Sequence, residues 1–266
     1  MNLTQDIFAM QGEVAVVTGG AGYLGAAMCD ALLSKGATVV VAARSQEKFH
    51  ARFGSGYEND PIHFIPCDIC EKAAFTDLYG EVAQRFGRID VVVNNANSVR
   101  GIGSHEISDS DWEYTLNGVL GQVQRSIVAV IPLMRQQQRG SIINIASMYG
   151  SVSPDFTLYQ GEGCEKYTSP PHYGAAKAAV LQLTRYYASL LGREGIRVNA
   201  IAPGPFPVAA IREANPVFLQ RLQNKTVTGK LGQPEDIMGL VLLLASSASQ
   251  FITGQQIAID GGWTIQ

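Results

Sequence analysis

Short apolar runs alternate with helix-length amphipathic segments from one end of the chain to the other. Continuous apolar runs are typical of strands that are buried on both faces, and strands that alternate with helices predict a parallel sheet. The sequence therefore predicts one doubly wound α/β domain over residues 1–266, with a seven-stranded parallel sheet covered by helices on both faces. The predicted strands are Glu13–Thr18, Thr38–Ala43, Ile62–Pro66, Ile89–Asn94, Ser141–Ala146, Ile196–Ile201 and Gln255–Asp260.

The chain has few charged residues, and its basic residues do not gather in one stretch. Only 16% of the residues are charged, against about a quarter in an ordinary protein, so much of the surface is expected to be hidden in a core or against other subunits. A net charge of −3 without a basic stripe argues against nucleic acid as a partner. No apolar run approaches the roughly 20 residues of a membrane helix, and the first residues lack the basic start of a signal peptide. We expect a cytoplasmic protein with no membrane partner.

The four cysteines are Cys29, Cys67, Cys70 and Cys164, too few and too scattered for a disulfide framework. Cys67 and Cys70 form a CxxC pair, which could be half of a zinc site, a redox pair, or two ordinary thiols at a strand end. No second CxxC or HxxxH completes a zinc site. Ordinary reduced thiols are the favoured interpretation, and no metal is predicted.

A glycine-rich segment, TGGAGYLG at residues 18–25, follows the first predicted strand and opens a helix that runs to about Lys35. Glycines allow a tight turn and let backbone N–H groups approach a pyrophosphate at the positive end of a helix. Although such a cluster can simply make a turn, its βαβ context predicts a dinucleotide site in a Rossmann-type fold. The predicted contacts are Gly19, Gly22, Tyr23, Leu24 and Gly25.

The second strand ends in Ala43, at the position where an acidic residue would bind the ribose 2′-hydroxyl of NAD. Arg44 and Ser45 follow, and a guanidinium beside a hydroxyl suits a 2′-phosphate. NADP(H) is therefore the preferred cofactor and NAD(H) a possible one. The alternative is a solvated arginine at a strand end.

Tyr173 and Lys177 stand four residues apart in a strongly helical segment, which places them on one helix face. A neighbouring ammonium favours the phenolate and lowers the pKa of a tyrosine. The pair is expected to exchange protons near neutral pH. A single YxxxK is weak, because long helices contain it by chance.

Taken with the other motifs, the chain resembles the short-chain dehydrogenase/reductase family, in its short single-domain branch, over nearly its whole length. It also resembles the gluconate 5-dehydrogenase-like members, which act on sugar acids and polyols. The motifs stand in order at strand ends: the glycine turn, Asp68, Asn94-Asn95-Ala96, Asn117, Ser147, Tyr173 with Lys177, and Pro203-Gly204.

The resemblance implies a role for each matching residue. Tyr173 would be the general acid/base, and Ser147 would hold the substrate oxygen. Lys177 would bind the nicotinamide ribose and lower the pKa of Tyr173, and Asn117 would hold a water that relays protons to Lys177. The remaining cofactor contacts carried over are Asp68 and Ile69 near the adenine, Asn95, Ala96 and Asn97 after the fourth strand, and Pro203, Gly204 and Phe206 at the carboxamide.

Three departures from the family pattern stand out. Tyr23 replaces a glycine, which brings the turn closer to the extended branch that includes sugar-nucleotide epimerases and dehydratases. Asn97 replaces another glycine, and the segment PGPFPVAA lacks the usual threonine after Pro203-Gly204. A chain of 266 residues has no room for the larger C-terminal substrate domain of the extended branch.

The segment from Gly150 to His172 is about twice its usual family length, and either shapes a site for a polyhydroxylated substrate or is a surface insertion. We expect the first. His172 is expected to pack at a helix start rather than relay protons. The leading prediction is an NADP(H)-dependent oxidoreductase that interconverts a carbonyl and an alcohol on a sugar, sugar-acid or polyol-like substrate, as a homodimer or homotetramer. An epimerase or dehydratase and a non-catalytic dinucleotide sensor are the alternatives.

Overall fold

The computed structural model describes residues 6–54, 61–103, 106–161 and 163–266 and contains one seven-stranded sheet. All strand pairs are parallel, in the spatial order β3-β2-β1-β4-β5-β6-β7, and the predicted doubly wound sheet is confirmed. The order reverses between β1 and β4, and ligands of such sheets bind at this point, beyond the carboxyl ends of the strands. The strands are β1 Val14–Thr18, β2 Thr38–Ala43, β3 Ile62–Pro66, β4 Val91–Asn94, β5 Gly140–Ile145, β6 Ile196–Pro203 and β7 Gln256–Ile259.

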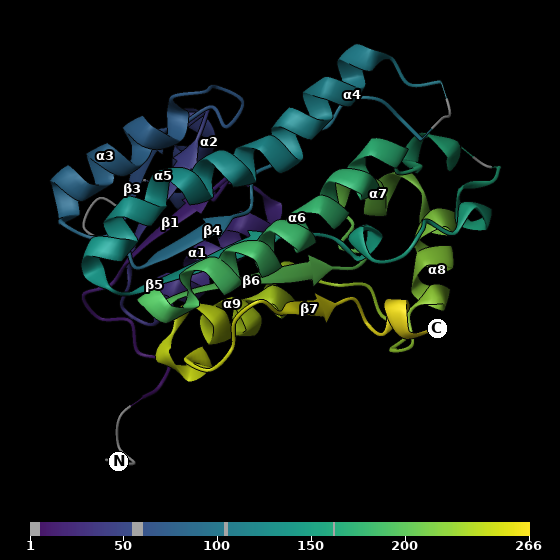
Figure 1. The fold of residues 1–266 in the computed structure, drawn as a ribbon. Coiled ribbons are helices and arrows are strands. Elements are labelled where there is room, and N and C mark those ends of the chain that lie inside the picture. Colours follow the sequence, from purple (N-terminus) through teal and green to yellow (C-terminus); the bar gives the residue numbers. More distant parts are fainter. Residues whose placement is uncertain (1–5, 55–60, 104–105, 162) are drawn as a thin grey trace.

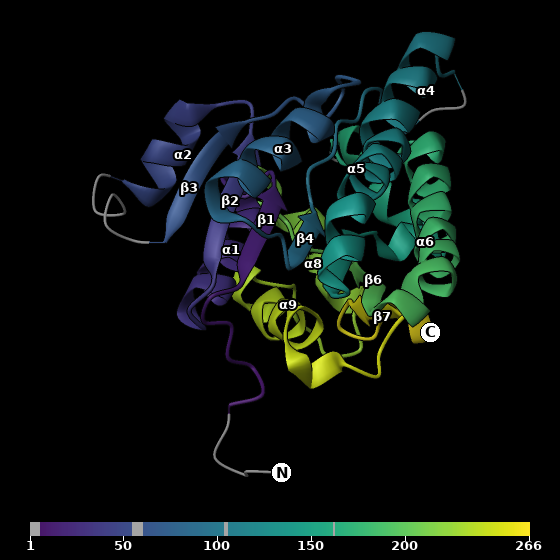
Figure 2. The ribbon, with the colours of Figure 1, turned by 60° about the vertical axis from the view of Figure 1, so that its left-hand side comes forward.

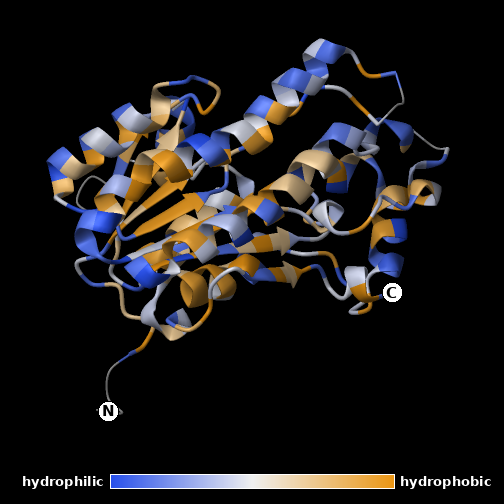
Figure 3. Ribbon diagram, in the orientation of Figure 1, coloured by the Kyte–Doolittle hydropathy of each residue, from blue (hydrophilic) through white to orange (hydrophobic). Residues whose placement is uncertain are grey.

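Helices cover both faces of the sheet (Figures 1 and 2). One apolar core lies between the sheet and three helices, α1 Tyr23–Ser34, α2 Gln46–Phe53 and α9 Met238–Ala245. A second core lies on the opposite face, against α3 Ala74–Phe86, α5 Gln122–Gln137 and α6 Pro171–Leu191. Because helices cover both faces, the strands at the centre of the sheet are mostly apolar, as Figure 3 shows.

The remaining helices, α4 Asp109–Leu116, α7 Ala209–Ala214 and α8 Pro216–Lys225, lie toward the carboxyl edge of the sheet (Figure 1). α4 begins at Ser108, whose hydroxyl accepts a hydrogen bond from the backbone N–H of Asp111. It continues into α5 through a π-helical turn, Asn117–Gly121. Such turns are rare in proteins, and those that occur are often found at functional sites. Over the described part of the chain, no helix is both long and apolar enough to span a membrane.

The long segment before α6 does not lie open on the surface. Its apolar side chains join those of α8 in a third, smaller core, which includes Leu158, Tyr159 and Phe218. Lys225 forms an ion pair of 2.9 Å with Asp155, and the Arg221 guanidinium donates to the carbonyl of Gln160. We call residues 150–161, 163–172 and α8 together the cap.

Candidate active site

A crevice of about 430 Å³ opens at the carboxyl ends of β1, β2 and β4. Its lining joins segments that are far apart in the sequence: the glycine turn, the end of β2 and the loops after β3 and β4. Eleven of the predicted cofactor residues line it, namely Gly19, Gly22, Tyr23, Leu24, Gly25, Arg44, Ser45, Ile69, Asn95, Ala96 and Asn97.

The glycine turn is closely packed. Gly19 has a φ of +65°, a conformation that residues with a side chain rarely adopt. A Cβ atom on Gly25 would lie 2.3 Å from the carbonyl oxygen of Gly19. The turn therefore needs glycine at both positions, and the N-terminus of α1 behind it offers the N–H groups and dipole that suit a pyrophosphate.

Two cations border the crevice beyond β2. Arg44 and Lys48 both line it, and no acidic residue lines it in the part of the chain that the structure describes. The Ser45 hydroxyl accepts a hydrogen bond from the backbone N–H of Lys48 and so begins α2. Lys48 was not predicted from the sequence. Its place three residues after Ser45, in the first turn of the next helix, could have indicated that it lies near the crevice.

Ser147, Tyr173 and Lys177 meet where β5 ends and α6 begins. Lys177 is buried, and its ammonium donates a hydrogen bond of 2.6 Å to the carbonyl of Ile145. The ammonium nitrogen lies 5.6 Å from the centre of the Tyr173 ring. The Ser147 side chain interacts with the Tyr173 phenol and acts to lower its pKa. The predicted serine, tyrosine and lysine therefore form one group.

The pKa shifts differ from the sequence-based expectation. Burial lowers the pKa of Lys177 to about 8. Burial also raises the pKa of Tyr173, and its interaction with Ser147 acts in the opposite direction. The expectation that Lys177 depresses the pKa of Tyr173 is wrong for this structure, because loss of hydration outweighs other effects on both groups.

Asn117 stands at the start of the π-helical turn. Its side-chain oxygen accepts a hydrogen bond of 2.7 Å from Arg125, and its side-chain nitrogen donates to the carbonyl of Cys70 at 3.3 Å. Its backbone carbonyl also accepts from the N–H of Gln122. The side chain is thus engaged with the loop after β3 and with α5, and the predicted water relay to Lys177 stays a prediction. Arg125 was not identified from the sequence.

The other predicted contacts have structural partners outside the crevice. The Asp68 carboxylate accepts from the backbone N–H of Cys70. A Cβ atom on Gly204 would lie 2.5 Å from the Cα of Asp260, so this position needs glycine, and the Phe206 ring lies against Gly232. None of Asp68, Pro203, Gly204 and Phe206 is among the residues that line the crevice.

Tyr23 connects the glycine turn to the loop that follows β6. Its hydroxyl donates a hydrogen bond of 3.2 Å to the carbonyl of Pro207, and Arg212 donates to the same carbonyl at 2.9 Å. The residue that departs from the family pattern therefore joins two segments predicted to contact the cofactor.

The CxxC pair, Cys67 and Cys70, consists of free thiols. All four cysteines are free, and burial raises the pKa of Cys67 to about 11, which disfavours its thiolate. No group of three His, Cys, Asp or Glu residues that could hold a metal occurs among the residues that the structure describes.

His172 is fully buried, next to Tyr173. Its Nε2 atom lies 2.9 Å from the carbonyl oxygen of Arg100, and its ring packs against Trp112 at 5.9 Å between centroids. The histidine therefore packs at the start of α6, as predicted.

A family model described as enoyl-(acyl carrier protein) reductase matches residues 19–264. The chain belongs to the short-chain dehydrogenase/reductase family. It is 31% identical to the 3-oxoacyl-[acyl-carrier-protein] reductase of Thermotoga maritima, over 96% of this chain and 99% of that protein. It is equally identical to the gluconate 5-dehydrogenase of Gluconobacter oxydans, over 98% of both proteins.

Among solved structures, a gluconate 5-dehydrogenase from Burkholderia cenocepacia in complex with NADP and tartrate superposes with a TM-score of 0.86. It is 29% identical, and the match covers 98% of both chains. As a short-chain dehydrogenase/reductase, the protein is an oxidoreductase of alcohol and carbonyl groups that uses an NAD(P) cofactor.

Proposed function

We propose that this protein is an NADP(H)-dependent carbonyl reductase, or the corresponding alcohol dehydrogenase, with Tyr173 as its general acid/base. The observation that carries the proposal is that the group of Ser147, Tyr173 and Lys177 and a glycine-lined crevice both lie at the carboxyl edge of the sheet, after neighbouring strands. Such an arrangement supplies a proton partner and an oxygen clamp at one carbon, which is what hydride transfer requires of a protein.

Each residue has a chemical task in this scheme. The nicotinamide, when bound, supplies or accepts the hydride. In reduction, the Ser147 hydroxyl holds the carbonyl oxygen, and the Tyr173 phenol donates a proton to the oxygen as negative charge develops there. The raised pKa of Tyr173 keeps the phenol protonated and ready to donate. Lys177, whose ammonium donates to the carbonyl of Ile145, would bind the nicotinamide ribose when the cofactor is present.

The preference for NADP(H) rests on Arg44 and Lys48. Both line the crevice at the end of β2, where an NAD-specific site would place a carboxylate. Two cations, with no acidic residue among the described residues of the lining, suit the doubly charged 2′-phosphate. Pro203, Gly204 and Phe206 would meet the carboxamide once the cofactor is bound.

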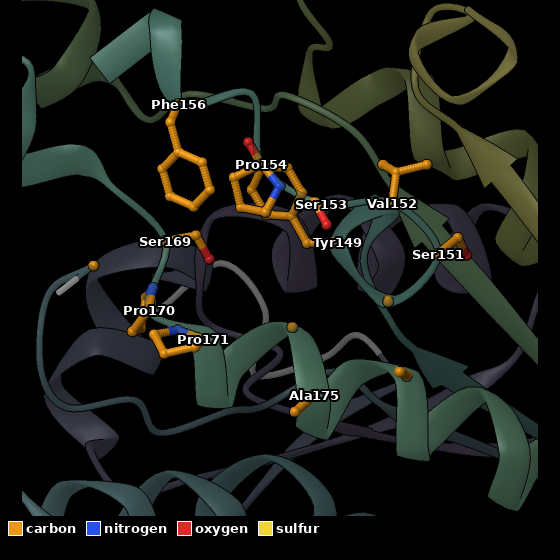
Figure 4. A pocket seen from close by; sticks show the side chains of 14 residues that line it. Tyr149, Ser151, Val152, Ser153, Pro154, Phe156, Ser169, Pro170, Pro171 and Ala175 are labelled. Atoms are coloured by element: carbon orange, nitrogen blue, oxygen red, sulfur yellow. The ribbon is translucent and has the colours of Figure 1, made fainter. Parts of the chain in front are cut away.

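The substrate that fits best is neutral. A cavity of about 740 Å³ lies between the cap and α6 (Figure 4). Its lining includes Tyr149, two residues after Ser147, and Gly174, the residue after Tyr173. Among the described residues that line it, none is charged; Ser151, Ser153 and Ser169 provide hydroxyls among apolar side chains. The Asp155 and Lys225 charges neutralise each other within the cap. A neutral ketone, sugar or polyol is therefore a better fit than a sugar acid, whose carboxylate would meet no cation among the described lining residues.

A substrate screen with purified protein tests the proposal. Neutral ketoses, polyols, cyclic ketones and sugar acids are offered with NADP(H) and NAD(H), and the absorbance of the reduced nicotinamide is followed. Tyr173→Phe is expected to abolish turnover and to leave the Kd for NADPH nearly unchanged. Normal turnover in this variant would sink the assignment of Tyr173, and faster turnover of sugar acids would overturn the neutral-substrate proposal.

The homo-oligomer proposal is supported by the outward faces of α5 and α6. Val128, Tyr186 and Leu190 are exposed large apolar side chains on these two helices. Exposed apolar patches on long helices mark protein interfaces. Light scattering at micromolar concentration tests this proposal, and a monomer would contradict it.

A further inference from the structure

Arg125 lies one helical turn beyond the π-helical turn that carries Asn117, and it contacts two segments of the site. One guanidinium nitrogen donates to the side-chain oxygen of Asn117 at 2.7 Å. The other donates to the backbone carbonyl of Ile69 at 2.7 Å and approaches the backbone carbonyl of Asn117 at 3.5 Å. A planar guanidinium with donors in a fixed fork can hold two acceptors at once, which a lysine ammonium does less well.

Both contacted segments belong to the candidate active site. Ile69 lines the crevice, and the next residue, Cys70, accepts a hydrogen bond from the Asn117 side chain. The loop after β3 and the π-helical turn are therefore joined by three hydrogen bonds, two of them from Arg125 to different segments. Hydrogen bonds to a charged donor are stronger than those between neutral groups.

Gly121 leaves the space that this contact needs. A Cβ atom on Gly121 would lie 3.1 Å from both the Arg125 Nη1 atom and the Asn117 side-chain oxygen, the two atoms of the hydrogen bond. Asn117, Gly121 and Arg125 thus stand at successive intervals of four residues. The π-helical turn lies within this spacing.

The same turn contacts the loop after β4, which also lines the crevice. The backbone N–H of Ser98 donates to the carbonyl of Gly118 at 3.1 Å. The side chain of Gln122, the first residue of α5, donates to the carbonyl of Ala96 at 3.0 Å. A displacement of the turn would therefore move both the loop after β3 and the loop after β4, which line the crevice.

We infer that Arg125 is a positioning residue, which fixes Asn117 and ties the catalytic turn to the loop that contacts the adenine side of the cofactor. The inference rests on the proposed function for its kinetic consequences, but the structural link can be measured without turnover. Arg125 itself is not assigned any contact with substrate or cofactor.

The experiment compares Arg125→Met with Arg125→Lys. Removing the guanidinium is expected to reduce kcat/KM roughly tenfold, with a fall in kcat and a rise in the Kd for NADPH, because small displacements of catalytic groups are costly. Arg125→Lys retains a cation and a single donor group, so it is expected to recover part of the loss. Arg135→Met is the matched control, because Arg135 lies on the same helix and pairs with Glu194 away from the site.

Hydrogen exchange of the cofactor-free protein provides the readout that does not depend on activity. In Arg125→Met, peptides that cover residues 66–72 and 116–122 are expected to exchange faster, with no change in Arg135→Met. Gly121→Ala should likewise lower kcat/KM and speed exchange in these peptides. Gly80→Ala should do neither, because a Cβ atom at Gly80 meets no atom within 4 Å.

Unchanged exchange in these peptides together with an unchanged Kd for NADPH would overturn the inference. A lower Tm with normal kcat/KM for the folded fraction would also overturn it, since a purely structural role would have that signature. If the wild-type protein shows no NADP(H)-dependent turnover, the proposed function fails, and the exchange experiment still decides whether Arg125 ties the two segments.

Discussion

The hydroxyl oxygens of Tyr149 and Tyr159 lie 2.5 Å apart and share a hydrogen bond. Tyr149 stands two residues after Ser147 and lines the cavity beneath the cap (Figure 4). Tyr159 lies within the cap, with its ring 5.6 Å from that of Phe218. Burial raises the pKa of both tyrosines, so both hydroxyls are protonated near neutral pH. This single contact joins the cap core to the wall of the candidate substrate cavity.

Replacing Tyr159 by phenylalanine tests what the contact does. The ring and its packing on Phe218 are retained, while Tyr149 loses its hydrogen-bond partner. One hydrogen bond contributes about 0.5–1.5 kcal/mol, so we expect the KM for the best substrate to rise roughly twofold to tenfold, with an unchanged Kd for NADPH. Tyr167→Phe is the control, because the Tyr167 ring also stacks on Phe218, with centroids 4.8 Å apart. Equal KM values in the wild type and Tyr159→Phe would show that the pair does not shape the cavity.

Lys177 gives a second prediction, on stability against pH. Its pKa is about 8 in the folded protein, below the ordinary value of 10.5. Between these values the unfolded chain holds a proton that the folded protein lacks, so the contribution of Lys177 to stability rises as the pH rises. A shift of this size corresponds to about 3 kcal/mol over the whole window.

The prediction is checked by urea unfolding of the wild type and Lys177→Met at pH values from 7.5 to 10. The difference in unfolding free energy, wild type minus variant, is expected to increase by roughly 2–3 kcal/mol across this range. Other groups titrate in both proteins and cancel in the difference. A constant difference would mean that Lys177 is not held in a desolvated state.

The sequence predicted those parts of the site that follow from short patterns of neighbouring residues. The seven strands and the glycine turn follow from apolar runs and glycine spacing. Once a parallel sheet is predicted, every strand end lies at the same edge, which brings Ser147 and Asn95 to the same side of the sheet without further information.

Other features depend on contacts that no local pattern shows. Arg125 reaches Ile69, 56 residues earlier in the chain, from the helix that follows the π-helical turn. The raised pKa of Tyr173 depends on how much water its phenol loses when the chain folds. The predicted pKa was wrong because spacing on a helix places the lysine nearby but does not indicate how much water both groups lose.

The cation pair at the end of β2 predicts how the protein distinguishes the two cofactors. Arg44→Ala is expected to weaken NADPH binding roughly tenfold or more, with little change for NADH, because a charge-assisted hydrogen bond contributes about 1.5–3 kcal/mol. Lys48→Ala should act in the same direction, and the double variant should bind the two cofactors with similar Kd values. Arg52→Ala on the same helix serves as the control, since Arg52 pairs with Asp30. An equal loss for NADPH and NADH would show that Arg44 does not contact the 2′-phosphate.

The glycine turn gives the strictest geometric prediction, at Gly25. A methyl group there would lie 2.3 Å from the Gly19 carbonyl oxygen and 2.9 Å from the Gly20 Cα atom, and both are backbone atoms that cannot rotate away. Gly25→Ala must therefore displace the turn, and we expect the Kd for NADPH to rise at least tenfold, because the N–H groups that face the pyrophosphate move with it. Gly80→Ala adds the same methyl group to a helix where nothing lies within 4 Å, and should bind NADPH normally. Fluorescence titration measures both, and normal binding by Gly25→Ala would mean that the pyrophosphate does not lie on this turn.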